Sequence, residues 1–239
     1  MLLEEGGSLQ ASGKMQNRLA LFVGILLLLT IACEDPPDRL EPDIGLDYFP
    51  LEIGSFRIYD VEAINIDRDT ANYQLKEVVV DSFAAGQGET AFVLHRFSRT
   101  QDRLPWDLDS AWTARLSGQY AVVVENNVPF AKVQFPVELG ASWDGNSFNN
   151  APEAIYEVKS VDQPFQIEAE SFSKSLVINE KDVFDTLIFK DARQAVYAKE
   201  IGLIYKRRER IDFCRFVECL GEIESGSIFE QKLIEYGQE

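Results

Sequence analysis

The sequence predicts a mainly antiparallel all-β fold, built as a single β-sandwich, barrel or curved sheet. From Tyr48 onward, alternating or β-branched runs are separated by turn residues roughly every 8 to 15 positions, a spacing typical of all-β domains. No stretch after residue 47 has the apolar period of a long amphipathic helix. With 46% hydrophobic residues, including 16 Phe and 8 Tyr, the chain can bury a sizeable core.

The candidate strands are runs rich in β-branched or aromatic residues and bounded by turn residues. They cover residues 55–64, 73–82, 90–99, 111–116, 119–125, 128–135, 155–161, 165–171, 176–178, 186–189, 195–199, 203–213 and 227–236. Asn126-Asn127 predicts a two-residue hairpin turn, since asparagine tolerates positive φ. Residues 182–198 are ambiguous, and a short helix near Ala192 or at 229–234 is an alternative to a strand.

A short motif occurs twice at the start of an expected strand. Residues 49–54 read FPLEIG, and residues 135–140 read FPVELG. Proline fixes the backbone on entry and glycine permits a tight bend, so the motif predicts a strand-entry turn. The repeat also predicts that the β-rich domain consists of two related halves, near 48–134 and 135–239.

The end of this motif occurs a third time, as Glu200-Ile201-Gly202, and an aromatic residue follows every copy within three positions. These aromatics are Phe56, Trp143 and Tyr205. We interpret them as residues that pack under the next strand, and the functional alternative is that they stack on a glycan.

The segment before the β-rich domain predicts export. An apolar run at residues 19–31 covers 13 residues, with Lys14 and Arg18 just upstream. This is the length of a signal-peptide core, and it is shorter than the roughly 20 residues that a bilayer-spanning helix needs. Residues 1–32 are therefore predicted to be a signal peptide.

The chain upstream of the apolar run suggests a later start. Glu4 and Glu5 precede the apolar core, where a signal peptide normally carries basic residues. We therefore predict that Met15 is the true start. After the signal peptide, residues 33–47 are rich in acids and prolines and predict an extended linker, followed by a β-rich domain at 48–239.

The apolar run ends in Leu29-Thr30-Ile31-Ala32-Cys33, which resembles the lipobox of bacterial lipoproteins. The resemblance implies diacylglycerol on the Cys33 thiol, cleavage after Ala32 and acylation of the new N-terminus. Several acyl chains on one residue make a stable anchor, because a single chain binds a membrane only marginally. The alternative is an ordinary secretory signal that ends by chance in a cysteine.

Two further features resemble exported lipoproteins of Bacteroidota. The acids after Cys33 resemble the signals that send some of these lipoproteins to the surface of the outer membrane, and a plain spacer on a periplasmic protein is the alternative. Tyr48 to Leu51 and Tyr197 to Lys199, each followed by a glycine and an aromatic, resemble motifs of uncharacterised members. This resemblance implies no activity.

Composition restricts the partners. The formal net charge of −17 disfavours nucleic acid and anionic lipid head groups, so membrane attachment is expected through the lipid.

Cys214 and Cys219 are separated by four residues and are predicted to form a disulfide in an oxidising envelope, with free thiols as the alternative. We predict no cofactor.

The sequence contains none of the common catalytic motifs of hydrolases, metalloproteases or nucleotide-binding enzymes. His95, the only histidine, lies in an apolar strand run and is interpreted as a strand residue. Two sets of charged residues are candidate binding sites, and each also has a purely structural interpretation. Asp102, Asp107 and Asp109 form an acidic set that suits Ca²⁺ or a solvated turn.

Lys206, Arg208 and Arg210 alternate along a strand and share one face, where they suit either an anionic sugar or lipid, or acids on neighbouring strands. The function that follows is a non-catalytic binding or accessory lipoprotein of the cell envelope, with a protein or glycan partner. The alternative is a carboxylate-based hydrolase that acts on an envelope or extracellular glycan.

Overall fold

The computed structural model describes residues 43–66, 68–185 and 188–239. The predicted signal peptide, Cys33 and most of the linker lie outside these residues and stay predictions. The described part consists of a short 3₁₀ helix, η1 (Leu46–Tyr48), and twelve β-strands. Within it, no helix has the length and apolar character needed to cross a lipid bilayer.

Consecutive strands pair as antiparallel hairpins, with the exception of β6 and β7. Their bounds are β1 (Ser55–Asn65), β2 (Thr70–Gly86), β3 (Glu89–Arg99), β4 (Asp107–Ser117), β5 (Tyr120–Glu125), β6 (Val128–Gln134), β7 (Ser142–Asp144), β8 (Ile155–Ile167), β9 (Glu170–Asp185), β10 (Phe189–Ala198), β11 (Gly202–Phe213) and β12 (Ile223–Gln238).

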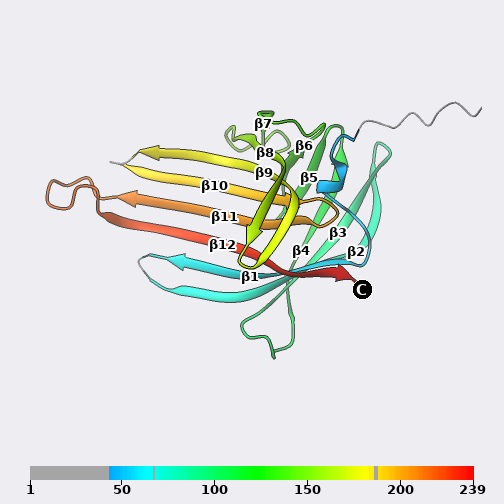
Figure 1. Ribbon diagram of the computed structural model, residues 1–239, viewed down its shortest axis with the longest axis horizontal. Helices are drawn as coiled ribbons and strands as arrows, with labels where there is room; N and C mark the ends of the chain where they lie inside the picture. Colours follow the sequence, from blue (N-terminus) through cyan, green and yellow to red (C-terminus); the bar gives the residue numbers. More distant parts are fainter. Residues whose placement is uncertain (1–42, 67, 186–187) are drawn as a thin grey trace, which may run out of the picture. The chain divides into compact units, whose positions relative to one another are not determined.

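All twelve strands belong to one sheet, in the order β6-β5-β4-β3-β2-β1-β12-β11-β10-β9-β8-β7. Strands β1 to β6 form one meander and β7 to β12 another, and the two join where β1 pairs with β12. The sheet curves until its two end strands, β6 and β7, approach each other (Figure 1). At this point the Ala131 amide, near the middle of β6, donates a hydrogen bond of 2.9 Å to the Gly145 carbonyl just after β7. The predicted all-β fold is confirmed as a nearly closed, barrel-like sheet.

Several predicted boundaries were wrong. The candidate strands 165–171 and 176–178 do not exist as separate elements, because β8 continues to Ile167 and β9 runs unbroken from Glu170 to Asp185. The ambiguous stretch around Ala192 is strand β10, and residues 229–234 lie in β12, so neither is a helix. The three-residue strand β7 was not predicted.

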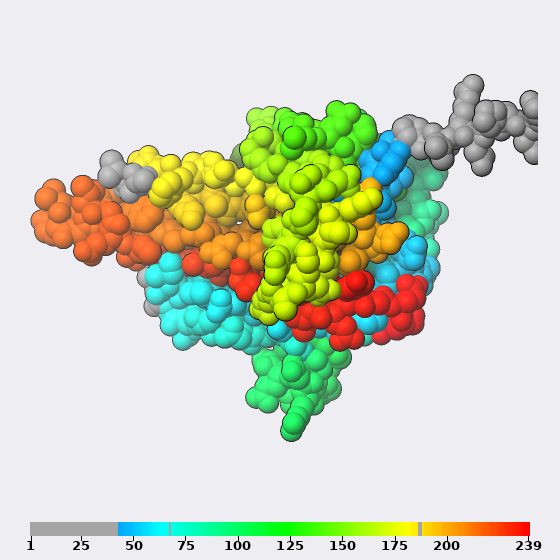
Figure 2. Space-filling view, viewed as in Figure 1, coloured from blue at the N-terminus to red at the C-terminus, as the bar shows by residue number. Residues whose placement is uncertain are grey.

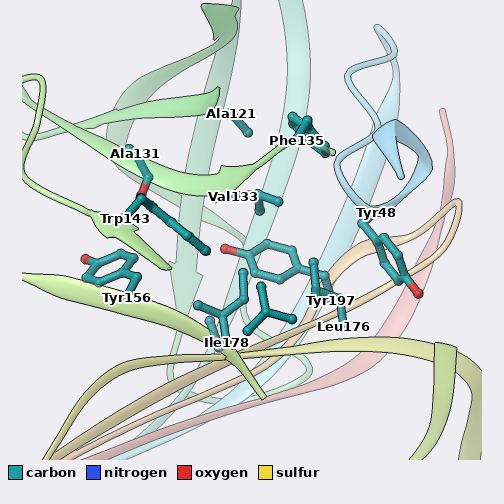
Figure 3. Close-up of a cluster of buried hydrophobic side chains, with 12 residues drawn as sticks. Tyr48, Ala121, Ala131, Val133, Phe135, Trp143, Tyr156, Leu176, Ile178 and Tyr197 are labelled. Carbon is teal, nitrogen blue, oxygen red and sulfur yellow. The ribbon is translucent and has the colours of Figure 1, made fainter. Parts of the chain in front are cut away.

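The largest hydrophobic cluster lies where the two ends of the sheet meet. Trp143 of β7 is 5% exposed, donates through Nε1 to the Ala131 carbonyl at 2.9 Å, and packs edge-on against Tyr156. Figure 3 shows Tyr197 between this pair and Tyr48 of η1. The cluster therefore connects both meanders and the N-terminal segment.

A second cluster forms under the β8–β9 hairpin, which crosses the face of other strands (Figure 2). Ile167 and Phe172 lie near the tip of this hairpin and are buried against Ile204 of β11 and Leu233 of β12. The hairpin thus protects one face of the long strands from water.

The repeated motif precedes the first strand of each meander, β1 and β7. Its glycines, Gly54 and Gly140, have φ values of 91° and 79°, which a glycine adopts without steric cost. These turns are therefore strand-entry turns in both places. That the halves are related stays a prediction.

The loop between β11 and β12 contains the disulfide between Cys214 and Cys219, whose Cα atoms are 5.7 Å apart. Cys214 is buried, and backbone bonds between Cys214 and both Glu222 and Gly221 continue the hairpin beyond the last paired residues. The disulfide therefore closes a short loop at the end of a long hairpin.

Candidate ligand-binding cavity

A cavity of about 60 Å³ lies against the inner face of the curved sheet. Part of its wall is apolar and includes Phe49, Leu94 and Tyr197. The rest carries charged side chains from both meanders: Arg57, Glu77, Arg96, Glu125, Lys132, Glu180 and Lys206. Such a concentration of charge inside a sheet is unusual, because ionised groups are costly to remove from water unless they are paired.

One group of these charges centres on Lys132 of β6. Its ammonium nitrogen lies 2.9 Å from Oε1 of Glu125 on β5 and 3.9 Å from Oε1 of Glu180 on β9. Lys206 Nζ of β11 lies 3.9 Å from the same oxygen of Glu125, and Arg208 Nη2 lies 3.8 Å from Oε2 of Glu180. We call these five residues the lysine cluster.

The lysine cluster controls the charge state of its members. Burial would raise the pKa of Glu125, but the ammonium groups of Lys206 and Lys132 outweigh burial and lower its pKa to about 2. The pKa of Glu180 is lowered as well, because Lys132, Lys206 and Arg208 outweigh its burial. Burial lowers the pKa of Lys206 to about 8 despite the nearby carboxylates. Both glutamates are therefore ionised at neutral pH.

A second group of charges centres on Glu77 of β2. Its two carboxylate oxygens lie 3.2 Å from Arg57 Nη2 and 3.6 Å from Arg96 Nε. Arg57 also donates through Nη1 to the Ile201 carbonyl at 2.9 Å, and the Arg96 guanidinium lies 3.7 Å from the centre of the Trp112 ring. We call Arg57, Glu77, Arg96 and Trp112 the arginine cluster.

The lysine cluster also forms the wall of a larger surface cleft. This cleft has a volume of about 640 Å³ and shares Glu125, Lys132 and Glu180 with the inner cavity. Phe130 and Tyr156 add aromatic surface to it. Ligand clefts in proteins typically measure about 300–1,000 Å³, so this cleft has room for a small molecule or a short segment of a polymer.

The two short motifs that resemble Bacteroidota lipoproteins meet beside the inner cavity. The rings of Phe49 and Tyr197 are 6.2 Å apart, and both line the cavity. Lys199 lies 5.3 Å from the centre of the Tyr48 ring and forms an ion pair with Asp47 at 3.1 Å. The motifs therefore fasten the N-terminal segment to the turn between β10 and β11.

Gly202, the first residue of β11 after this turn, leaves no room for a side chain. Its φ is 91°, and a Cβ atom there would lie 2.8 Å from Nη1 of Arg57. We expect Gly202→Ala to lower the free energy of unfolding by about 1–3 kcal/mol, because alanine is strained at positive φ and displaces the guanidinium. Urea denaturation measures this change. Gly86→Ala is the control for strain alone, since φ is 88° and no atom lies within 4 Å there. Equal losses in both variants would contradict the role of Arg57.

The predicted basic face on β11 is only partly brought together. Lys206 and Arg208 both reach the lysine cluster, as alternation along a strand requires, and they pair with acids of neighbouring strands. Arg210 is 62% exposed and lies 4.0 Å from Asp212. Arg207, on the other face, pairs with Glu230 at 3.2 Å. The three residues therefore do not form one site.

The other candidates also lie apart from the cavity. Asp102 is in the β3–β4 loop, 4.0 Å from Arg99, whereas Asp107 and Asp109 are exposed on β4. Within residues 43–66, 68–185 and 188–239, no three acidic, histidine or cysteine side chains are placed to hold a metal ion. His95 is a β3 residue that packs edge-on against Phe97.

Sequence reasoning missed most of the cavity. Lys132 is a lysine between two fully buried apolar residues, in the run Ala131-Lys132-Val133. Glu180 similarly follows the apolar run 176–178 on β9. Glu180 lies on the inward phase of β9 with Leu176 and Ile178, whereas Lys132 is the residue skipped at a register shift in the pairing of β5 with β6. A charged residue within or just after an apolar run is the signal that could have found both.

No protein-family model and no curated protein sequence matches this chain. Two solved structures are similar to it. One is described as a "putative exported protein with YmcC-like fold" from Bacteroides fragilis, with 15% identity and a TM-score of 0.42. The other is described as a "putative lipoprotein" from Parabacteroides distasonis, with 11% identity and a TM-score of 0.35. Both matches cover 80% of this chain and 98% of the other.

Proposed function

We propose that this chain is a cell-envelope lipoprotein, anchored in the outer membrane through acylated Cys33, whose sheet is a non-catalytic binding module. The observation that supports a binding role is the charge-lined cavity and the cleft beside it, which share Glu125, Lys132 and Glu180. The lipobox at residues 29–33 supports the anchor. The module faces the periplasm or the cell surface and meets a glycan or another envelope protein.

The charge states in the cavity favour binding over the alternative of a carboxylate-based hydrolase. Glycoside hydrolysis by two carboxyl groups needs one that stays protonated near neutral pH and acts as a general acid. Glu125 and Glu180 are the two acids that the cavity and the cleft share, and the pKa of each is lowered rather than raised. Their ion pairs with Lys132 suit a fixed, preorganised wall better than proton transfer.

The anchor is tested by metabolic labelling with a radioactive fatty acid. We expect label in the wild-type chain and none in Cys33→Ala, because Cys33 carries the thiol that the lipobox presents to the acyl donor. Cys219→Ala is the matched control and should keep the label. A wild-type chain without label, or Cys33→Ala labelled as strongly as wild type, would refute the lipid anchor.

A further inference from the structure

Three buried nitrogen atoms of residues that line the inner cavity have no hydrogen-bond partner among the described residues. They are Nε of Arg57, Nε of Arg96 and Nε1 of Trp112, and all three carry a hydrogen to donate. Arg57 is only 6% exposed. Arg96 Nε lies 3.6 Å from Oε2 of Glu77, which is beyond hydrogen-bond distance but makes this carboxylate its ion-pair partner. Buried donors in folded proteins are nearly always paired, so the other two, Nε of Arg57 and Nε1 of Trp112, indicate an acceptor that the chain itself does not provide.

The balance of charge on the wall has the sign that suits an anion. Four cations line the inner cavity, namely Arg57, Arg96, Lys132 and Lys206, against three carboxylates, Glu77, Glu125 and Glu180. Each carboxylate already has a cation within 4 Å. The wall therefore carries one more cation than carboxylate, although the net charge of the whole chain is −17.

The donors are held in place before any ligand arrives. Arg57 is fixed by the Ile201 carbonyl and by Glu77, and Arg96 is fixed by Glu77 and by stacking on Trp112. Fixed donors bind an anion more tightly than mobile ones, because less freedom is lost on binding. One water needs about 10–15 Å³ of such space, so the 60 Å³ cavity fits a group of about four to six non-hydrogen atoms.

We propose that the inner cavity binds a small oxyanion, the carboxylate, phosphate or sulfate group of a ligand, between Arg57, Arg96 and Trp112. Guanidinium groups and an indole N–H are suitable donors to such oxygens. The inference deepens the proposed binding role and rests on it, but it does not depend on the lipid anchor. It assigns the recognition of an anionic group to the arginine cluster rather than to the basic face of β11.

Isothermal titration calorimetry tests this proposal on the full-length lipoprotein in detergent. The probes are sodium sulfate, inorganic phosphate and sodium acetate, each titrated at constant ionic strength set with sodium chloride. We expect saturable binding at one site per chain for at least one of the three, and the probe that binds best identifies the class of oxyanion. If none of them binds above the chloride background, the proposal is overturned.

Two variants test whether the anion binds at the arginine cluster. Arg96→Gln removes a charged donor whose side chain is 14% exposed, and we expect the Kd to rise about tenfold to hundredfold. Trp112→Phe keeps a ring under Arg96 but removes the indole donor, and we expect a rise of about tenfold. Arg207→Gln on the other face of β11 is the matched control and should bind as wild type does.

Circular dichroism confirms that each variant is folded before its titration. Binding that is as tight in both Arg96→Gln and Trp112→Phe as in wild type would overturn the assignment to this cavity. The outcome is separate from that of the proposed anchor: a chain that takes up fatty acid at Cys33 but binds none of the three anions remains a lipoprotein without an oxyanion site.

Discussion

Lys132→Met is expected to lower the free energy of unfolding by about 3–5 kcal/mol at pH 7. Lys132 is 5% exposed and is the cation that stands closest to Glu125, and its loss leaves Glu125 and Glu180 ionised, buried and poorly paired. Removing one partner of a buried ion pair is costly for this reason, whereas an exposed pair contributes little. Urea denaturation of the wild type and the variant at pH 7 measures the difference.

The pH dependence of this difference separates charge from packing. Without Lys132, the pKa values of Glu125 and Glu180 rise, so these residues take up protons at mildly acidic pH and the penalty shrinks as the pH falls from 7 to 5. Lys159→Met is the matched control, because Lys159 pairs with Glu157 in solvent, with 42% and 43% of their side chains exposed. A loss for Lys132→Met that is the same at both pH values would show that methylene packing, not charge, is responsible.

Trp143→Ala is expected to lower the free energy of unfolding by about 3–5 kcal/mol. The indole is buried at the junction between β7 and β6, where it fills space next to Tyr156 and donates to the Ala131 carbonyl. Alanine leaves a cavity and removes the hydrogen bond. Differential scanning calorimetry or urea denaturation measures the loss.

Trp143→Phe separates the loss of the indole hydrogen bond from the loss of apolar packing. Phenylalanine keeps most of the apolar surface and removes only the indole N–H, so we expect a loss of about 1–2 kcal/mol. If Trp143→Ala cost no more than Trp143→Phe, the contact between the two ends of the sheet would contribute little to stability. The barrel-like closure would then depend on other residues.

The sequence predicts the simple hairpins well and the β8–β9 hairpin poorly. Strands β1 and β11 are found within a residue or two, because their apolar alternation is continuous and turn residues bound them. In β8, the sequence Asp162-Gln163-Pro164 resembles a loop, yet the strand continues through it with register shifts and a φ of 54° at Asp162. The turn that follows has Glu168 at a φ of 52°, where no glycine or asparagine marks it.

The cavity could not be predicted, because it depends on how the sheet closes. Lys132 and Glu180 are 48 positions apart, on β6 and β9, and nothing in either strand specifies the other as a neighbour. Their contact exists because β6 and β7, at opposite ends of the sheet order, come together. Alternation along β11 did predict that Lys206 and Arg208 share a face, since that follows from strand geometry alone.

Glu125 and Glu180, the acids that the cavity and the cleft share, are ionised at neutral pH as members of ion pairs, which suits binding rather than catalysis. Titration of the carboxyl carbons of Glu125 and Glu180 by NMR tests this claim most directly. The folded-state pKa of Glu125 lies below its unfolded value, so its contribution to stability is present above about pH 4.5 and is lost as the pH falls toward 2. We predict a pKa near 2 for Glu125 and a lowered pKa for Glu180. A pKa raised above the ordinary glutamate value of 4.5 for either residue would contradict the account and favour a general acid.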